Sequence, residues 1–434
     1  MRKLFKKIGN FFWKDKRRIL LLAIFSLFIF LRFYEIETKS IFGFDQVDSA
    51  WAAKDIIVDH KFPLIGPENK LGSGFFVGPL YYYLISIFYF FTDLDPIAAG
   101  LFAGFTSVIG FFTLFFVTKK LFSFNLALIA VLLNTVSYSA IQFDRIQWEI
   151  NFVPIVSTLA FYFLYKTIRG NEKNILYLGI ILALAFHVHL TAAVFIAATI
   201  LLTLPFFPKT KKTLLYFMYS APILLLSLSP IIIVNILNDH SYILKQLQYA
   251  ESSFHGINPT RISQLFEDAF IHIESYLDFP LIRFLSVVVV PSFLIIYYLN
   301  RPSRESFAMI YLVFLFFAVP LLILSTYSHE ISDYYFSTNR FIGLIALSYI
   351  IYKLIELKKT AVIASFIIFT LYYSTISIER FFSKPVIGLS NHRAYVIEHV
   401  QQHKIIPFLH GSPHSYLYYF YTREKQRNKL MNRF

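Results

Sequence analysis

The sequence contains no cysteine and is poor in charged residues. None of its 434 residues is Cys, which excludes disulfide bonds and thiolate metal sites. Charged residues make up 15% of the chain, against about 25% in an average soluble domain, while hydrophobic residues reach 57%. Apolar runs of roughly 17–25 residues recur, and each is long enough to cross about 30 Å of hydrocarbon. The composition therefore predicts an all-α membrane protein that crosses the bilayer many times.

The formal net charge is +14, but the basic residues do not form a surface suited to nucleic acid. They stand in short clusters between apolar runs, as the positive-inside rule predicts for cytoplasmic loops. The basic N-terminus is followed by an apolar stretch, Ile19 to Phe33, that has no small-residue cleavage site after it. This pattern indicates a retained signal anchor with its N-terminus in the cytoplasm.

Charge also decides which apolar runs cross the membrane. If every run crosses, five basic clusters, beginning with Lys119-Lys120, fall outside. If the short Tyr-rich run 79–92 stays at the outer interface, where Tyr is enriched, all five return to the cytoplasm. The prediction is about 11 transmembrane helices, with a first external loop over 35–96 and a C-terminus outside. The predicted crossing runs are 19–34, 97–117, 123–141, 152–165, 174–187, 190–207, 213–237, 281–299, 306–326, 341–352 and 360–377.

The first external loop contains an amphipathic pattern from Gln46 to Asp59. Val47, Trp51, Ile57 and Val58 share one face, which predicts a helix lying in the plane of the interface. Asp55 and Asp59 belong to its solvated face. Asp45 precedes the pattern at a position where Asp serves well as a helix N-cap. An ionisable residue near membrane depth is also a candidate for function, so both interpretations of Asp45 stay open.

The order of these features resembles a known family. Asp45 follows the first span, a helix and "GPLYYYL" come next, and then "TKKLFSFNLALIAVLLNTVSYSAIQFDRIQWEINFVP". The set resembles the GT-C fold glycosyltransferases, in the branch of protein O-mannosyltransferases and lipid A aminoarabinose transferases. The resemblance covers residues 15–200 well and 200–378 only in hydropathy. It implies a glycosyltransferase domain over 1–378, with two outer-face juxtamembrane helices, and a small extracytoplasmic tail over 379–434, in which apolar runs around Pro407 and Gly411 are strand-like.

The same resemblance implies the site residues. Asp45 matches the family's first acidic residue and would be catalytic, and Gln46 stands where Glu is common, so Asp48 would compensate for the lost charge. Asp144 and Arg145 match the place where members carry an acid and an arginine after the third span. From the residues themselves, either Asp144 or Glu149 could complete a carboxylate pair with Asp45. Arg340, at the mouth of a later span, is expected to bind the substrate's phosphate together with Arg145, because a guanidinium binds phosphate bidentately.

Two histidines stand apart from this set. His187 and His189 lie at a predicted outer turn in "AFHVHLTA", a spacing compatible with metal binding but also with an ordinary polar turn. Whether a divalent metal is used as a cofactor is left open by the sequence.

Together these features predict a multi-pass enzyme of the plasma (inner) membrane that acts on its extracytoplasmic side. It would move a sugar, hexosyl or pentosyl, from a polyprenyl-phosphate donor to a glycan, lipid or protein acceptor, with inversion at the anomeric carbon. The alternative is a transporter or flippase of lipid-linked or anionic solutes, but no internal repeat is evident and the candidate charges gather at one face.

Overall fold

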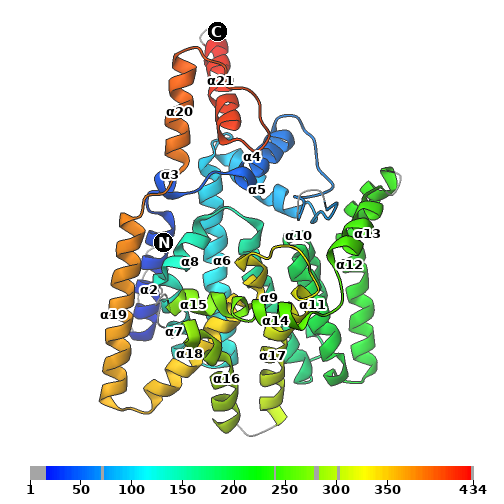
Figure 1. Ribbon diagram of the computed structural model, residues 1–434, viewed down its shortest axis with the longest axis vertical. Helices are drawn as coiled ribbons and strands as arrows, with labels where there is room; N and C mark the ends of the chain where they lie inside the picture. Colours follow the sequence, from blue (N-terminus) through cyan, green and yellow to red (C-terminus); the bar gives the residue numbers. More distant parts are fainter. Residues whose placement is uncertain (1–15, 70–72, 239–240, 278–282, 301–303, 432–434) are drawn as a thin grey trace, which may run out of the picture.

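The protein is built from helices. The computed structural model describes residues 16–69, 73–238, 241–277, 283–300 and 304–431. Across these residues no strand forms, and pairing is limited to two isolated bridges, Glu68 with Phe76 and Phe254 with Tyr327. Figure 1 shows the long helices side by side, with the shorter α3, α4 and α5 and the pair α20 and α21 gathered at one end.

Over the described residues, each of the eleven runs predicted to cross the membrane corresponds to a helix; the run 123–141 falls on two, and the run 190–207 also includes the short helix η2 (Leu204–Phe206). The helices of these runs are α2 (Lys16–Phe33), α6 (Ile97–Leu121), α7 (Phe124–Val136), α8 (Tyr138–Arg145), α9 (Val153–Ile168), α10 (Asn174–Val188), α11 (Leu190–Thr203), α12 (Lys211–Leu237), α16 (Arg283–Asn300), α17 (Arg304–Leu324), α18 (Arg340–Glu356) and α19 (Thr360–Ser383).

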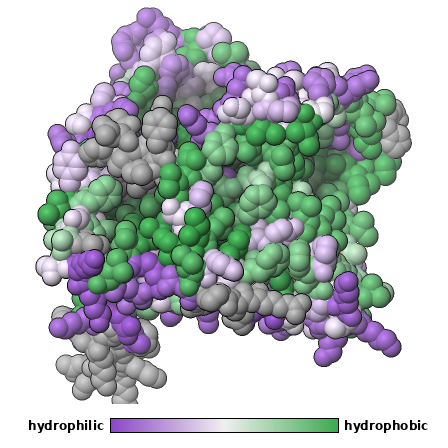
Figure 2. All heavy atoms as spheres, turned by 60° about the horizontal axis from the view of Figure 1, so that its bottom comes forward, coloured by the Kyte–Doolittle hydropathy of each residue, from purple (hydrophilic) through white to green (hydrophobic). Residues whose placement is uncertain are grey.

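Length and composition alone give fewer spans than the charge pattern. Four helical stretches among the described residues can cross a bilayer: 97–121, 211–237, 306–324 and 333–356. The pair α7 and α8, bent by 72°, counts as a fifth if it forms one broken span. Helices α10, α11 and α16 are apolar but shorter. The protein is thus a multi-pass membrane protein, and the number of eleven crossings stays a prediction. Figure 2 shows apolar side chains across the middle of one face and hydrophilic ones at its margins.

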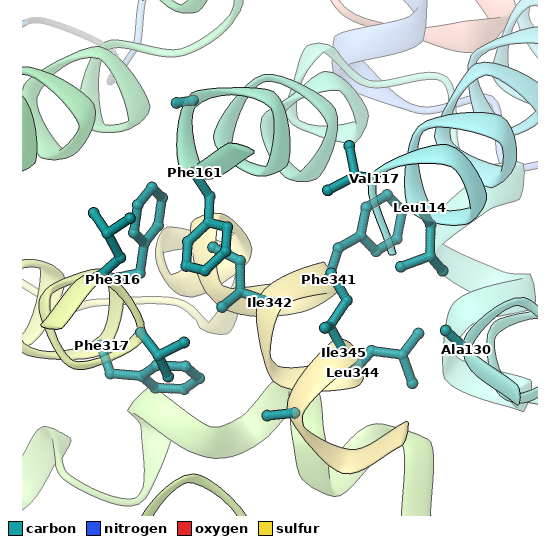
Figure 3. Packing of buried hydrophobic residues seen from close by; sticks show 14 of the residues in the cluster. Leu114, Val117, Ala130, Phe161, Phe316, Phe317, Phe341, Ile342, Leu344 and Ile345 are labelled. Carbon is teal, nitrogen blue, oxygen red and sulfur yellow. The ribbon is translucent and has the colours of Figure 1, made fainter. Parts of the chain in front are cut away.

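The core lies around α18. Every residue from Arg340 to Tyr349 is buried, and a helix that is apolar on all sides belongs in an interior. Figure 3 shows Phe341 and Ile345 of α18 facing Leu114 of α6 and Ala130 of α7, while Phe161 of α9 lies near Phe316. Helix α12 differs, because only Ser220 and Asn235 on it are buried.

The loop 35–96, predicted to be external, forms α3 (Ile36–Lys39), α4 (Phe44–Ile57) and α5 (Leu80–Phe91). The N-cap interpretation of Asp45 is wrong. Gly43 occupies the N-cap position, and its backbone N–H donates to Gln46 Oε1 at 2.9 Å, so Asp45 lies inside the first turn. The side chain of Gln46, at position N3, thus accepts the hydrogen bond from the N-cap backbone. The carboxylate of Asp45 is not needed for capping and can make other contacts.

Helix α4 also buries a face other than the one predicted. Val47, Ala50 and Ala53 are fully buried, whereas Val58 is exposed. Trp51, expected at the membrane interface, packs its ring edge-on against Tyr416 at 5.1 Å between centroids. The reason is that α5 and the C-terminal helices supply a protein surface for this helix, which the sequence pattern alone does not reveal.

The C-terminal segment is helical, and the prediction of strand-like runs around Pro407 and Gly411 is wrong. Helices α20 (Leu389–Gln401) and α21 (Pro413–Met431) pack together, and 402–412 is the loop between them. We call 389–431 the C-terminal hairpin. It is fastened by Arg393, which pairs with Glu37 at 2.8 Å and with Asp95, and by the hydroxyl of Tyr416, which donates to the carbonyl oxygen of Leu94 at 3.0 Å.

The other connections between the long helices form short helices. They are η1 (Glu149–Phe152), η2 (Leu204–Phe206), α13 (Ser241–Ser253), α14 (Pro259–Leu265), η3 (Asp268–Phe270), α15 (Ile271–Leu277) and η5 (Asp333–Asn339). Helix α15 is not a surface helix, because Ile273 and Tyr276 on it are buried in the core.

Candidate functional site

A buried amide network joins the second external loop to α4 and α5. Gln46 donates from Nε2 to the carbonyl oxygen of Gln147 at 2.7 Å. The amide of Gln147 donates in turn to Ser49 Oγ at 3.1 Å and to the hydroxyl of Tyr81. The two glutamines therefore hold the segment before η1 against the first turns of α4, and they bring Glu149 into the neighbourhood of Asp45.

Asp45, Asp48 and Glu149 form what we call the acidic cluster. Asp45 remains accessible to solvent and makes no hydrogen bond or ion pair with any residue that the structure describes. The surrounding protein nevertheless raises the pKa of its carboxyl by desolvation, and the nearby charge of Asp48 raises it further. A carboxylate that is accessible, partly desolvated and without a cation partner can accept a proton from a bound hydroxyl group.

Glu149 lies deeper. Burial, together with the charges of Asp45 and Asp48, raises the pKa of its carboxyl to about 8, although a hydrogen bond from its own backbone N–H opposes the shift. Glu149 therefore carries a proton at neutral pH. Of the two acids left open by the sequence as partners of Asp45, Glu149 is the one whose charge interacts with it.

Asp48 is held from two sides. The hydroxyl of Tyr82, on α5, donates to its Oδ2 at 2.5 Å. On the other side Nε2 of His410, from the C-terminal hairpin, lies 3.7 Å from Oδ1. The sequence offers no signal for a contact between His410 and Asp48, because the two residues lie far apart in the chain. Only the docking of the C-terminal hairpin on α4 brings them together.

Asp144 and Arg340 meet elsewhere, in a buried ion network. Arg340 Nη2 lies 3.1 Å from Asp144 Oδ1, and Arg32 Nη2 lies 2.9 Å from Asp144 Oδ2. Arg340 also donates from Nε to the hydroxyl of Tyr276 at 3.0 Å. Arg32 was not among the predicted residues. Its signal in the sequence is an arginine in the last turn of the first apolar run, since a charge inside such a run calls for a partner.

Arg145 lies beside this network and closes the end of α2. Its guanidinium donates to the carbonyl oxygens of Leu31, Arg32 and Glu35 at 3.1, 2.9 and 3.2 Å. Neither Arg145 nor Arg340 makes a hydrogen bond or an ion pair with the acidic cluster. The predicted residues thus separate into two groups, Asp45 with Asp48, and Asp144 with Arg145 and Arg340.

His187 and His189 have different neighbours. The ring of His187 occupies the space that a Cβ at residue 78 would need, so Gly78 is required for this close packing. His189 is buried, with its Nδ1 2.6 Å from Thr191 Oγ1 and its ring edge-on to Tyr334. Within the described residues no group of three or more His, Cys, Asp or Glu side chains is arranged to hold a metal ion.

The protein also contains an apolar cavity of about 160 Å³. It is connected to η1 through three aromatic rings. The ring centroids of Trp148 and Tyr334 are 5.0 Å apart. The ring of Tyr334 stacks on that of Tyr335, a residue of the cavity wall, with 4.7 Å between centroids. The wall is formed by Asn69, Ser73, Phe75, Leu190, Thr191, Val194, Phe195, Tyr249, Phe254, Ile323, Leu324, Tyr327 and Tyr335.

Comparison with known proteins supports the fold. A family profile described as dolichyl-phosphate-mannose-protein mannosyltransferase matches residues 77–235. No curated protein matches the chain significantly.

Similar solved structures exist for most of the chain. ArnT from Cupriavidus metallidurans, bound to undecaprenyl phosphate, aligns with a TM-score of 0.55 at 8% identity, over 92% of this chain and 74% of ArnT. The oligosaccharyltransferase of Archaeoglobus fulgidus, in complex with Zn and sulfate, aligns with a TM-score of 0.55 at 12% identity, over 91% of this chain and 58% of the other. The archaeal oligosaccharyltransferase AglB, in complex with an inhibitory peptide and a dolichol-phosphate, aligns with a TM-score of 0.52 at 14% identity, over 89% of this chain and 58% of AglB. The predicted GT-C fold is confirmed.

Proposed function

We propose that this chain, a multi-pass membrane glycosyltransferase of the GT-C type, moves a sugar from a polyprenyl-phosphate carrier to an acceptor hydroxyl. The observation that carries the proposal is Asp45, an accessible carboxylate with no partner among the described residues, set beside a second carboxyl that keeps its proton. The matching family is described by a dolichyl-phosphate donor, and ArnT and AglB were solved with polyprenyl phosphates bound. These findings support a donor of the same chemical class here.

The proposed reaction is a single displacement. The acceptor hydroxyl gives its proton to the carboxylate of Asp45, and its oxygen attacks the anomeric carbon of the sugar. The bond from that carbon to the phosphate oxygen breaks, and its electron pair leaves with the polyprenyl phosphate. Because attack and departure occur on opposite faces, the anomeric configuration inverts. Since only the ionised Asp45 can accept the proton, transfer slows as the pH falls through its raised pKa.

The other residues have supporting parts in this proposal. Glu149 stays neutral at pH 7 and therefore does not add a negative charge opposite the phosphate. The apolar cavity is suited to the first isoprene units of the carrier, because its wall is almost entirely apolar. Arg145 and Arg340, expected to bind the phosphate, are engaged with carbonyl groups and with Asp144. We therefore assign them an indirect part, that of fixing α2, α8 and α18 beneath the site.

The proposal also has a location. The site lies on the extracytoplasmic side of the plasma (inner) membrane, residues 1–378 form the transferase domain, and 379–434 lie outside the membrane. The acceptor is a glycan, lipid or protein hydroxyl group, and the transferred sugar is a hexose or a pentose.

The test is sugar transfer by the purified protein in detergent, with mannosyl- and aminoarabinosyl-decaprenyl phosphate as donors. Asp45→Asn keeps the shape of the side chain and should reduce the rate by about 10²–10⁴, the usual effect of losing a positioned base. The matched control is Asp55→Asn on the same helix, where the carboxylate is exposed and pairs only with Lys54 among the described residues, and its rate should stay within about twofold of wild type.

Two outcomes contradict the proposal. If Asp45→Asn transfers sugar as fast as wild type, the assignment of the base is wrong. If wild type transfers no sugar from either donor but moves a lipid-linked substrate across liposome membranes, the protein is a transporter.

A further inference from the structure

A phosphate beside the acidic cluster would be stabilised by a cation, and the nearby basic residues of α4, α8 and α18 are already engaged with other groups. Lys54, the lysine of α4, lies 3.1 Å from Asp55 and 2.6 Å from Asp59. The guanidinium groups of Arg145 and Arg340 are buried, and they are already bonded to carbonyl groups of α2 and to Asp144, respectively. A donor that carries a negative phosphate, and a product that carries a more negative one, would thus meet carboxyl groups without compensation.

The C-terminal hairpin brings a titratable cation to this place. Nε2 of His410 lies 3.7 Å from Asp48 Oδ1, and the His410 side chain is 59% exposed. The other oxygen of Asp48 is occupied by the hydroxyl of Tyr82. An imidazole placed in this way has one nitrogen toward a carboxylate and the rest of its ring open to a ligand.

The loop that bears His410 has a defined structure. Gly411 has a φ of 80°, and a Cβ at this residue would overlap the ring of Phe44 in α4. The ring of Phe44 in turn lies edge-on to His410, with 6.2 Å between centroids. Ser415 Oγ accepts from the backbone N–H of Leu409 at 2.9 Å and closes the turn. His410 is therefore held over the first turn of α4 by contacts on both of its sides.

We infer that His410, in its imidazolium form and with Asp48 as counterion, binds the phosphate of the polyprenyl donor. The inference rests on the proposed function and adds that the C-terminal hairpin is part of the substrate site. A charge-assisted hydrogen bond from an imidazolium to a phosphate oxygen is among the stronger single contacts that a protein can make.

The inference predicts that binding depends on the charge at residue 410. The side chains that face His410 are Asp48 and Phe44 on α4, and Tyr82 of α5 acts on it through Asp48. A permanent cation at this position should therefore bind the phosphate, and a neutral side chain should not.

The experiment measures two quantities on the full chain in detergent: the dissociation constant of decaprenyl phosphate, and KM and kcat for a decaprenyl-phosphate sugar. For His410→Gln, both the dissociation constant and KM should rise about 10–100-fold, which corresponds to the loss of a charged hydrogen bond, while kcat changes little. His410→Lys keeps a permanent cation and should restore tight binding.

The control is His403→Asn in the same exposed loop, where φ is 57° and Asn is tolerated. It should bind and turn over like wild type.

The outcomes separate the inference from the proposed function. If sugar transfer occurs and His410→Gln keeps the wild-type KM, or if His410→Lys fails to restore binding, the inference is wrong and the function stands. If decaprenyl phosphate binds in a way that depends on His410 but no sugar is transferred, the inference stands and the proposed transfer is wrong.

Discussion

At the scale of single residues, the environment of each carboxyl decides what it can do. Asp45 and Glu149 share one acidic cluster, yet the pKa of Glu149 rises to about 8 while that of Asp45 rises less. The difference follows from burial, since Asp45 is accessible and Glu149 lies behind the amide network of Gln46 and Gln147. Environments that separate two carboxyl groups in this way give them different protonation states at one pH.

The stability of the protein should record the proton on Glu149. Between roughly pH 4.3, where a free Glu ionises, and about 8, the folded state binds one more proton at this residue than the unfolded state. The free energy of unfolding must then fall as the pH rises through this window. Glu149→Gln removes the effect, so the melting temperature of the variant relative to wild type should be higher at pH 8 than at pH 5. Equal differences at the two pH values would show that Glu149 is ionised when folded.

The sequence could predict Asp45 but not its partners. Asp45 follows the first apolar run, and this position in the chain is enough to single it out. Asp144 and Glu149 are both acids of one short loop, and only the turn of α8 into η1 sends one toward Arg32 and the other toward Asp45. Such a choice depends on packing between helices far apart in the chain, which hydropathy and charge patterns do not encode.

At the scale of elements, the network of Arg32, Asp144 and Arg340 ties together α2, α8 and α18. One carboxylate is bonded by two guanidinium groups, and the side chains of all three are nearly inaccessible. Removing the acid leaves two buried cations without a counterion, which costs far more than the loss of an exposed pair.

Asp144→Asn should therefore destabilise the protein by about 3–5 kcal/mol, the usual cost of breaking a buried ion pair. Thermal unfolding in detergent measures the effect, and Asp59→Asn, which loses an ion pair with Lys54 at the surface, is the matched control. Melting temperatures that fall equally in both variants would contradict a structural part for Asp144.

Docking of the C-terminal hairpin depends on Gly411. Gly411→Ala places a Cβ in a left-handed backbone conformation that costs about 1–2 kcal/mol, and it also displaces the ring of Phe44. Hydrogen exchange of the amides of α21 should become faster, while that of α18 should not change. The control is Gly256→Ala, since a Cβ at Gly256 meets nothing within 4 Å. Unchanged exchange in α21 would show that the hairpin docks without this contact.

The elements themselves were largely predictable. Apolar runs long enough to cross a bilayer must form helices there, because backbone groups in hydrocarbon need internal hydrogen bonds. The C-terminal hairpin was not predictable in the same way. Its apolar side chains suit a strand as well as a helix. In the structure Tyr416 lies on α21 and Phe408 in the loop before it, and both rings contact Trp51, a residue far away in the sequence.

At the scale of the whole molecule, the arrangement of charges predicts the sidedness. The short helices α4 and α5 gather with α20 and α21 at one end, and Lys119-Lys120 stand at the C-terminal end of α6 (Figure 1). If α5 does not cross, Lys119-Lys120 are cytoplasmic and His410 is external.

Single-cysteine labelling tests this directly, because the chain has no native Cys. A membrane-impermeant maleimide added to intact cells should label His410→Cys and not Lys120→Cys. Permeabilised cells provide the control, in which both positions should react. Labelling of Lys120→Cys from outside would mean that α5 crosses and that the eleven-span topology is wrong.

The buried network also bears on how the chain is made. Arg32 lies at the end of α2, and its acid partner, Asp144, follows 112 residues later. Until Asp144 is synthesised, α2 must wait at the membrane with an arginine that has no counterion, and Arg340, which completes the set, comes 196 residues later still. Helix α2 therefore reaches its final place only after Arg340 has been made, so an element that is inserted early is locked late.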